Sequence, residues 1–408
     1  MTPRRTPAAF ATALLAGALV LACGSGVGHA DVNADIARDL RGPASSWALG
    51  SDATIHVADA ESGTSIFGRR ADERQIPAST MKVITAATSL STLGPDHRFV
   101  TRVVRGDSRD QIILVGGGDP LLTSADLRRL ASRTARALKR EGTSGPLRLF
   151  LDDYLFPAPT PAKGWAPGDS PAYASAVRPL GIVGEYSSDT TASALAAFVG
   201  ALREKGLTVS YAGRALAEED APDIASFDDH RLSDAVELML RVSENNVAEI
   251  LFRQVALARG YPATWSSSAA AAREALGALG IDTSPVRLID GSGLSSSNRL
   301  TARTLTDVLD LVLDGAHADL RPLFDGLPVA GESGTLTYRF AAPPANCAKG
   351  EVFAKTGSLT GVNTLAGLTE GQDGEWKSFA IMVNSAPSNT TATKLAIDTI
   401  AATVHGCT

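Results

Sequence analysis

Three short motifs in this sequence carry side chains that could perform nucleophilic chemistry, and the first is an S-x-x-K pair. A helix places positions i and i+3 on one face, so the amine of Lys82 can reach the hydroxyl of Ser79. A serine hydroxyl is a weak nucleophile until a neighbouring base takes its proton. Lysine is such a base only where burial or nearby positive charge lowers its pKa toward neutrality. By itself the pair is equally compatible with a helix cap followed by an exposed lysine.

The other two motifs supply polar groups that could hold a substrate. Ser243 and Asn245 form an S-x-N motif, in which the hydroxyl could relay a proton and the amide could hold a carbonyl. Serine and asparagine are also common in ordinary turns between helices. A K-T-G-S run extends from Lys355 to Ser358, where a lysine beside hydroxyls could bind a carboxylate. Gly357 in that run would let a ligand backbone approach closely, although a solvated strand end is the simpler alternative.

The elements expected around these motifs follow from hydrophobic periodicity. Apolar residues at helical spacing after Pro77 predict a helix that begins at Ser79, and helices are expected on both sides of Ser243–Asn245. Residues 157–171 are rich in Pro and Gly and are expected to be irregular, and acidic residues 218–223 to form a loop. The expected strands are 53–58, 64–69, 99–105, 111–115, 147–151, 207–211, 352–358, 363–369 and 376–384. The expected helices are 80–93, 124–141, 191–205, 233–241, 246–258, 269–279, 301–313 and 391–404.

The order of these elements predicts a split domain. A hairpin and a helix at the front, combined with the later helices, three strands and a last helix, can close into one α/β domain. This domain would consist of residues 31–95 and 229–408. Residues 96–228 would form an α+β domain inserted between the S-x-x-K and S-x-N motifs. The predicted fold class is therefore α/β, with an antiparallel sheet, flanking helices and a helical subdomain.

Taken together, the three motifs are far more specific than any one of them. They occur in the order found in penicillin-binding proteins and serine β-lactamases, each in the expected context of helix start, inter-helix turn and edge strand. The chain resembles the class C low-molecular-mass penicillin-binding proteins, the D-alanyl-D-alanine carboxypeptidase/endopeptidase family, over nearly all of its length after residue 30. The resemblance rests on residues 76–82, 114–121, 243–249, 290–295, 327–331, 334–336, Arg339 and 354–359.

This resemblance implies a transpeptidase-like domain and acyl transfer on a stem peptide of peptidoglycan that ends in D-Ala-D-Ala. Ser79 would attack the penultimate D-Ala carbonyl, and Lys82 would take the serine proton. Ser243 would pass a proton to the departing D-Ala, while Asn245 would hold the amide on the acyl side. Water would then release the acyl-enzyme. β-Lactams are expected to bind the same serine covalently.

The resemblance also assigns the K-T-G-S run to the terminal carboxylate of the substrate. Lys355, Thr356 and Ser358 would bind this carboxylate, with Gly357 allowing close approach. The backbone N–H groups of Ser79 and Ser358 would form the oxyanion hole. No metal or organic cofactor is implied.

One departure from the family concerns the inserted domain. Better-known members carry a much longer insertion made of two domains, so the outer one is expected to be missing here. In the family an acidic residue of the insertion can meet the free amine of the diamino acid in the stem peptide. Asp169, near Trp165 and Tyr173, is the candidate for this role; a solvated loop acid is the alternative.

The N-terminus predicts export. Arg4 and Arg5 precede an apolar run over residues 8–22, which is shorter than the roughly 20 residues of a membrane span. A charged start, a short apolar core and a small-residue exit are typical of a secretory signal, here residues 1–30. An alternative is a lipoprotein signal ending at Cys23, which would anchor the protein to a membrane. Either reading places the protein at the periplasmic or cell-wall side, or outside the cell.

Export also bears on the cysteines, because Cys23 falls in the signal and leaves Cys347 and Cys407. Two thiols in an oxidising compartment usually pair. A bridge would close a loop of about 60 residues, worth roughly 4 kcal/mol in the chain-entropy model. Two free buried thiols are the alternative.

Composition excludes several other classes of protein. Of 408 residues, 38 are basic and 44 acidic, and the net charge of -6 argues against a nucleic-acid partner. A hydrophobic share of 44% is enough for a full core. The sequence contains neither a C-x-x-C pair nor an H-E-x-x-H motif, so a dedicated metal site is not expected.

Two rival functions share the motif set. A serine β-lactamase or related esterase would differ mainly in the speed of deacylation, and a slow peptidoglycan-binding or penicillin-binding protein would keep the site without rapid turnover. A Ser-His-Asp hydrolase is disfavoured because the sequence has no G-x-S-x-G elbow. Carboxypeptidase and endopeptidase activity remain alternatives, because both cut after a D-Ala carbonyl.

Overall fold

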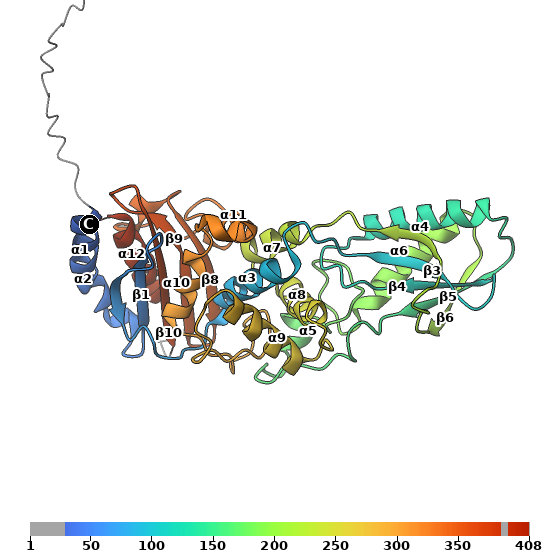
Figure 1. The fold of residues 1–408 in the computed structure, drawn as a ribbon, viewed down its shortest axis with the longest axis horizontal. Helices are drawn as coiled ribbons and strands as arrows, with labels where there is room; N and C mark the ends of the chain where they lie inside the picture. Colours follow the sequence, from blue (N-terminus) through green and yellow to red (C-terminus); the bar gives the residue numbers. More distant parts are fainter. Residues whose placement is uncertain (1–28, 385–390, 408) are drawn as a thin grey trace, which may run out of the picture.

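The computed structural model describes residues 29–384 and 391–407. Two five-stranded sheets lie toward opposite ends of an elongated molecule, with a group of helices between them (Figure 1). Most of the predicted signal segment, including Cys23, lies outside the described residues. None of the helices in the described ranges combines the length and the hydropathy that a membrane span requires.

The first sheet is antiparallel, with strand order β2-β1-β10-β9-β8. Its strands are β1 Thr54–Asp59, β2 Ser65–Arg69, β8 Val352–Leu359, β9 Val362–Glu370 and β10 Trp376–Asn384. Strands β9 and β10 are buried along nearly their whole length. Helix α12 (Thr391–His405) packs on this sheet, as does helix α10 (Ala302–Asp310). Covering a sheet on both faces removes the usual alternation of buried and exposed positions.

The central helices bury the helix that carries the S-x-x-K motif. They are α3 Met81–Leu93, α7 Leu232–Arg241, α8 Asn245–Ala258 and α9 Trp265–Ala278. Every residue of α3 from Met81 to Leu90 is buried, because α7, α8, α9 and α10 all pack around it. A helix that is enclosed on all sides is held rigidly, so Lys82 leaves water when the core forms.

The second sheet is mixed, with strand order β6-β5-β4-β3-β7. Its strands are β3 Thr101–Arg105, β4 Gln111–Val115, β5 Leu147–Asp152, β6 Val209–Arg214 and β7 Asp223–Phe227. Helices α4 (Ser124–Arg140) and α6 (Thr190–Glu204) pack against each other and share a separate apolar core with this sheet. All five strands fall inside residues 96–228, the segment predicted as an insertion.

The α/β fold class is confirmed, and the structure adds elements that the sequence pattern did not reveal. Strand β7 was not predicted; the expected loop over residues 218–223 ends at its first residue, Asp223, and in this edge strand only Phe227 is buried. Helix α1 (His29–Asp39) was not predicted either. The remaining short helices are α2 Arg41–Ala44, α5 Asp169–Ala172 and α11 Arg321–Asp325, and the 3₁₀ turns are Trp47–Leu49, Ala78–Thr80, Gly315–Leu320, Gly334–Leu336 and Ala345–Ala348.

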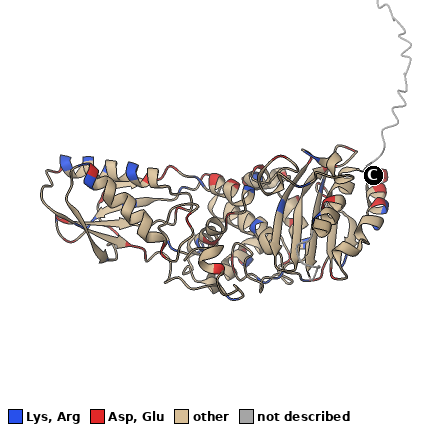
Figure 2. Ribbon diagram, turned by 180° about the vertical axis from the view of Figure 1, so that it is seen from behind, with Lys and Arg blue, Asp and Glu red and all other residues tan. Residues whose placement is uncertain are grey.

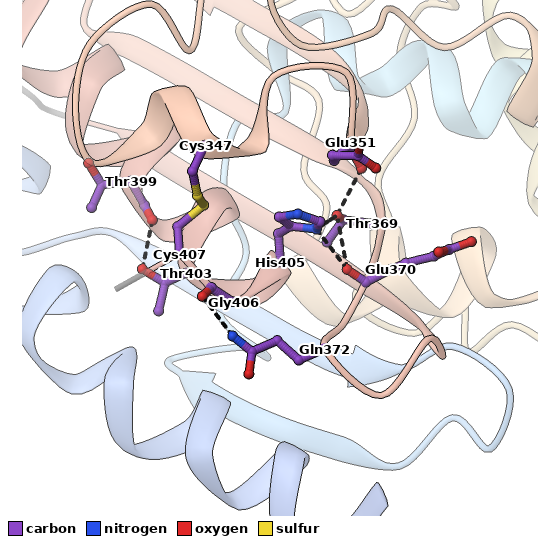
Figure 3. The surroundings of a disulfide bond; sticks show 10 residues. All are labelled: Cys347, Glu351, Thr369, Glu370, Gln372, Thr399, Thr403, His405, Gly406 and Cys407. Atoms are coloured by element: carbon purple, nitrogen blue, oxygen red, sulfur yellow. Dashed lines mark hydrogen bonds between the residues drawn. A yellow bond between two sulfur atoms is a disulfide. The ribbon is translucent and has the colours of Figure 1, made fainter. Parts of the chain in front are cut away.

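A disulfide joins Cys347, in the turn before β8, to Cys407, just after α12 (Figure 3). Two hydrogen bonds fasten the same region to the first sheet. The Nε2 atom of Gln372 donates to the carbonyl of Gly406 at 2.9 Å, and Nδ1 of His405 lies 2.9 Å from the carbonyl of Glu370. The end of the chain is therefore tied both to the sheet and to the turn that precedes β8.

Candidate active site

Ser79 lies in the 3₁₀ turn Ala78–Thr80, directly before α3. Ala78 has φ of +48°, a backbone conformation that residues other than glycine rarely adopt. The surrounding structure holds this turn, because the hydroxyls of Thr80 and Thr364 both donate to the carbonyl of Pro77, at 2.6 and 2.8 Å. The turn is thus fixed from the α3 side and from strand β9.

The amine of Lys82 connects three segments of the chain. Its Nζ atom lies 3.1 Å from Ser79 Oγ, 2.7 Å from Asn245 Oδ1 and 2.8 Å from the carbonyl oxygen of Ser292. A neutral amine has two N–H groups and one lone pair. Because Asn245 Oδ1 and the Ser292 carbonyl are acceptors only, they take both N–H groups. The lone pair of neutral Lys82 then faces the hydroxyl of Ser79.

Burial makes this neutral form more accessible than it is for an exposed lysine. Complete burial lowers the pKa of Lys82 from 10.5 to about 8, although the negative charges of Glu249, Glu244 and Asp290 oppose the shift. Lys355 is also fully buried, and burial together with the positive charge of Lys82 lowers its pKa well below the usual value. The Lys82 amine can therefore accept a proton near neutral pH.

Buried carboxylates hold the loop that presents the Ser292 carbonyl. Glu249 on α8 accepts hydrogen bonds from the backbone N–H groups of Gly291 and Ser292, both at 2.9 Å. Burial, reinforced by the charge of Asp290, raises the pKa of Glu249. Asp290 in turn accepts from Gly293 N at 3.0 Å. A side chain at position 293 would clash with the carbonyl of Ala78, so this loop packs directly against the turn of Ser79.

The S-x-N turn connects α7 to α8. Ser243 has φ of +63°, and its hydroxyl forms no hydrogen bond with another described residue. Besides meeting Lys82, Asn245 donates from Nδ2 to the carbonyl of Tyr173 at 2.8 Å. Tyr186 donates from its hydroxyl to Glu244 at 2.6 Å. The segment around Tyr173 and Tyr186 therefore fixes the S-x-N turn from the side of the second sheet.

Strand β8 lies at the edge of the first sheet, beside the turn of Ser79. A Cβ atom at Gly357 would lie 2.9 Å from both Pro77 O and Ser79 N, so only glycine fits there. Lys355 Nζ donates to the carbonyl of Thr356 at 2.8 Å, and the hydroxyls of Thr356 and Thr335 are 2.7 Å apart. Ser358 is exposed. Strand β8 thus approaches the turn of Ser79 most closely at Gly357, with Thr356 and Ser358 on either side of that glycine.

Asp169 lies farther from this cluster. It begins the short helix α5, and its carboxylate accepts from the backbone N–H of Ala166 at 2.6 Å, which caps its own turn. Its carbonyl accepts from Tyr173 N at 2.7 Å. Asp169 is therefore linked to the candidate site through Tyr173, and among the described residues no hydrogen bond joins its carboxylate to another predicted site residue.

Several groups of the site were not singled out from the sequence. They are the carbonyls of Ser292 and Tyr173, the carboxylate of Glu249 and the hydroxyl of Thr335. Glu249, Ser292 and Thr335 lie in sequence runs that support the family resemblance. Those runs marked the residues as part of the family pattern but did not indicate what each residue does. A backbone carbonyl has no side-chain signature at all. Within the described part of the chain, no group of His, Cys, Asp or Glu is arranged to hold a metal ion.

Comparison with known sequences shows extensive similarity to carboxypeptidases. A carboxypeptidase of Mycobacterium tuberculosis is 35% identical over 351 residues, covering 82% of this chain and 76% of the relative. A D-alanyl-D-alanine carboxypeptidase of Actinomadura is 29% identical over an alignment of 465 residues, covering 91% of this chain and 84% of the relative. Because that alignment is longer than the 408 residues of this chain, the Actinomadura protein contains segments with no counterpart here.

Comparison of folds gives the same result. The crystal structure of penicillin binding protein 4 from Haemophilus influenzae matches with a TM-score of 0.73 at 23% identity, covering 86% of this chain and 95% of that one. The same protein in complex with a β-lactam matches with a TM-score of 0.69. This confirms the predicted fold. The model of the D-Ala-D-Ala carboxypeptidase 3 (S13) family matches residues 33–186 and 183–404, and the chain belongs to that family.

Proposed function

We propose that this protein is a serine-type D-Ala-D-Ala carboxypeptidase that trims the stem peptides of peptidoglycan through an acyl-serine intermediate. The observation that carries the proposal is the position of the Lys82 amine, 3.1 Å from Ser79 Oγ and fully buried. A nucleophile and a base at this separation can transfer a proton directly. Membership of the family and the similarity to named carboxypeptidases support the choice of substrate.

The proposed reaction begins when Ser79 Oγ attacks the carbonyl of the penultimate D-Ala and transfers its proton to Lys82 Nζ. The backbone N–H groups of Ser79 and Ser358 would stabilise the oxyanion. Collapse of the tetrahedral intermediate breaks the peptide bond, and the leaving amine takes a proton from the Ser243 hydroxyl, which recovers one from Lys82. Water then attacks the acyl-enzyme, with Lys82 again as the base.

The carboxylate end of the substrate would lie against strand β8. The hydroxyls of Thr356 and Ser358 would donate to the terminal carboxylate, and Thr335 would orient Thr356 through their 2.7 Å contact. A bound carboxylate next to Lys355 would favour the charged form of that lysine, whose pKa is otherwise lowered by burial. Substrate binding would therefore supply a counter-charge for Lys355.

The position of the site is also compatible with endopeptidase activity. The S-x-N turn is bordered by Tyr173, whose backbone carbonyl accepts from Asn245 and whose side chain is exposed; this residue would lie on the acyl side of the peptide. Asp169, four positions earlier, would meet the free amine of the diamino acid only if its carboxylate left the cap on Ala166. We assign it that role as a secondary element of the proposal.

The same function implies a location outside the cytoplasm, where peptidoglycan is found. The charged and apolar segment of residues 1–30 supports export, and Cys23 would be the attachment site if the protein is a lipoprotein. Peptidoglycan stem peptides and β-lactams are the proposed partners.

Labelling with a fluorescent penicillin tests the mechanism. The purified protein without residues 1–30 should form a covalent, long-lived adduct, and Ser79→Ala should form none. Release of D-Ala from a peptide ending in D-Ala-D-Ala should be lost in the same variant. Rapid turnover of the penicillin without lasting label would identify a β-lactamase instead. Absence of any reaction in the unaltered protein would refute Ser79 as the nucleophile.

A further inference from the structure

Helix α4 carries a concentration of positive charge at the end of the molecule farthest from the first sheet (Figure 2). Of its 17 residues, only Asp126 is acidic. Its basic residues are Arg128, Arg129, Arg133, Arg136, Lys139 and Arg140. The whole chain has a net charge of -6, so this helix differs sharply from the rest of the protein.

Most of this charge is not neutralised by neighbouring acids. Arg129 pairs with Asp126, and Arg129 and Arg133 both lie near Asp229. The other four basic residues of α4 form no ion pair within the described ranges. Lys139 donates to the carbonyl of Lys205 at 2.7 Å, which places the end of α6 next to this patch.

A groove of about 630 Å³ runs between α4 and the edge strand β7. Its walls contain four cations and no acidic side chain, and the lining residues are Arg133, Arg136, Lys139, Arg140, Ile224, Ala225 and Ser226. Arg133 is held in place, because it donates to the carbonyl of Ser226 at 2.8 Å. Arg136 and Arg140 are one turn apart, about 6 Å along the helix axis, so positive charge repeats along the groove.

We propose that this groove binds a polymeric anion that carries phosphodiester groups, in the cell wall around the substrate. The planar guanidinium group matches phosphate oxygens in a two-pronged geometry, and a row of them suits a chain with regularly spaced charges. The inference rests on the proposed function, because that function places the protein in the wall. Binding at α4 would keep the catalytic end of the molecule close to its substrate.

The structure favours a polymer over a membrane surface. A helix that lies on a membrane inserts an apolar face between the lipids. The apolar face of α4, including Leu127, Leu130 and Leu138, is instead buried against the second sheet. Neither α4 nor β7 exposes a large hydrophobic side chain among the described residues. The cations also line a hollow, which fits a chain better than a flat surface.

The first test measures binding of fluorescently labelled inorganic polyphosphate by anisotropy. The unaltered protein should bind with an affinity that falls as salt increases. The double variant Arg136→Glu with Arg140→Glu should bind polyphosphate at least about tenfold more weakly than the unaltered protein. A control with the same change in net charge, Arg41→Glu with Arg273→Glu, alters exposed arginines outside the groove and should stay within about twofold of the unaltered protein. Equal loss in both variants would overturn the proposal.

A second test uses the wall itself. Purified cell walls should pull down the unaltered protein but not the groove variant, and treatment with hydrofluoric acid, which cleaves phosphodiesters, should abolish the difference. Binding to phosphatidylglycerol vesicles in place of polyphosphate would identify a membrane surface and refute the polymer. Both variants should still be labelled by fluorescent penicillin, which shows that they are folded. Failure of that labelling in the unaltered protein would refute the proposed function. The polyphosphate measurement would then still decide whether the groove binds a phosphodiester polymer.

Discussion

At the scale of single residues, the properties of the site depend on what surrounds Lys82. The same side chain on an exposed helix would have a pKa near 10.4 and would hold its proton at neutral pH. Here burial lowers that pKa to about 8, while the carboxylate of Glu249 limits the shift. Glu249 also holds the loop that supplies the Ser292 carbonyl to the amine. It acts on the reaction through Lys82, without touching the substrate.

This arrangement predicts how the acylation rate depends on pH. The rate should rise as Lys82 loses its proton, with a midpoint near pH 8. Glu249→Gln removes a negative charge that raises the pKa of Lys82, so its midpoint should move to lower pH. The measurement is the rate of penicillin labelling between pH 5 and 10.

Glu249→Asp is the matched control. It keeps the negative charge, but its shorter side chain moves the carboxylate away from the backbone N–H groups of Gly291 and Ser292. It should slow labelling with little movement of the midpoint. A Glu249→Gln profile that coincides with that of the unaltered protein would show that Glu249 only supports the fold.

At the scale of elements, strand β8 and the turn of Ser79 are packed so closely that Gly357 cannot be replaced. Gly357→Ala should push the strand away from Ser79 and slow labelling by at least about fivefold, since overpacking of this kind costs about 1–3 kcal/mol and each 1.36 kcal/mol is tenfold in rate. Gly68→Ala on β2 is the control, because its Cβ would meet only Ala71 at 3.8 Å. Equal rates in the two variants would contradict the close packing of β8.

A second element-scale prediction concerns His230, where the chain returns from β7 to α7. Its Nδ1 lies 2.8 Å from Asp119 and its Nε2 lies 3.6 Å from Asp126 in the first turn of α4. The hydrogen bond to Asp119, with the charges of Asp126 and Asp229, raises the pKa of His230. This stabilisation is complete below pH 6.5 and is lost as pH rises through the raised pKa.

Thermal unfolding at pH 6 and pH 9 checks this sign. His230→Gln should lower the Tm more at pH 6 than at pH 9. His97→Gln provides the opposite case, because burial lowers the pKa of His97 and protonation there destabilises the fold. If His230→Gln lowers the Tm equally at both pH values, the ion pair between His230 and Asp119 does not stabilise the fold.

The elements near the site were predicted more completely than the contacts between them. Ser79, Lys82, Ser243, Asn245 and Lys355 could be proposed because three short motifs occur in a specific order, each in the element context expected for it. The carbonyls of Ser292 and Tyr173 could not be predicted. Every residue has a backbone carbonyl, and only tertiary packing determines which of them reach the site. Strand β7 escaped for a related reason: an exposed edge strand has no apolar alternation to detect.

At the scale of the whole molecule, the Cys347–Cys407 disulfide closes a loop that contains the last three strands and α12. Replacing both cysteines by serine should lower the free energy of unfolding by roughly 4 kcal/mol, because the unfolded chain regains freedom over 60 residues. Denaturant unfolding measures this change. Penicillin labelling at 25 °C should persist, since neither cysteine contacts the site. A reducing agent should destabilise the unaltered protein and leave the double variant unchanged.

The site is assembled from segments that are far apart along the chain, and this has a consequence for biosynthesis. The ribosome makes Ser79 and Lys82 early, whereas β8 and β9, which pack against the turn of Ser79, are made near the end. Until the later helices pack around α3 and these strands close over the turn of Ser79, the site is incomplete, and an unburied Lys82 keeps an ordinary pKa. A nascent, stalled or truncated chain that lacks these segments therefore carries the nucleophile in an inert form.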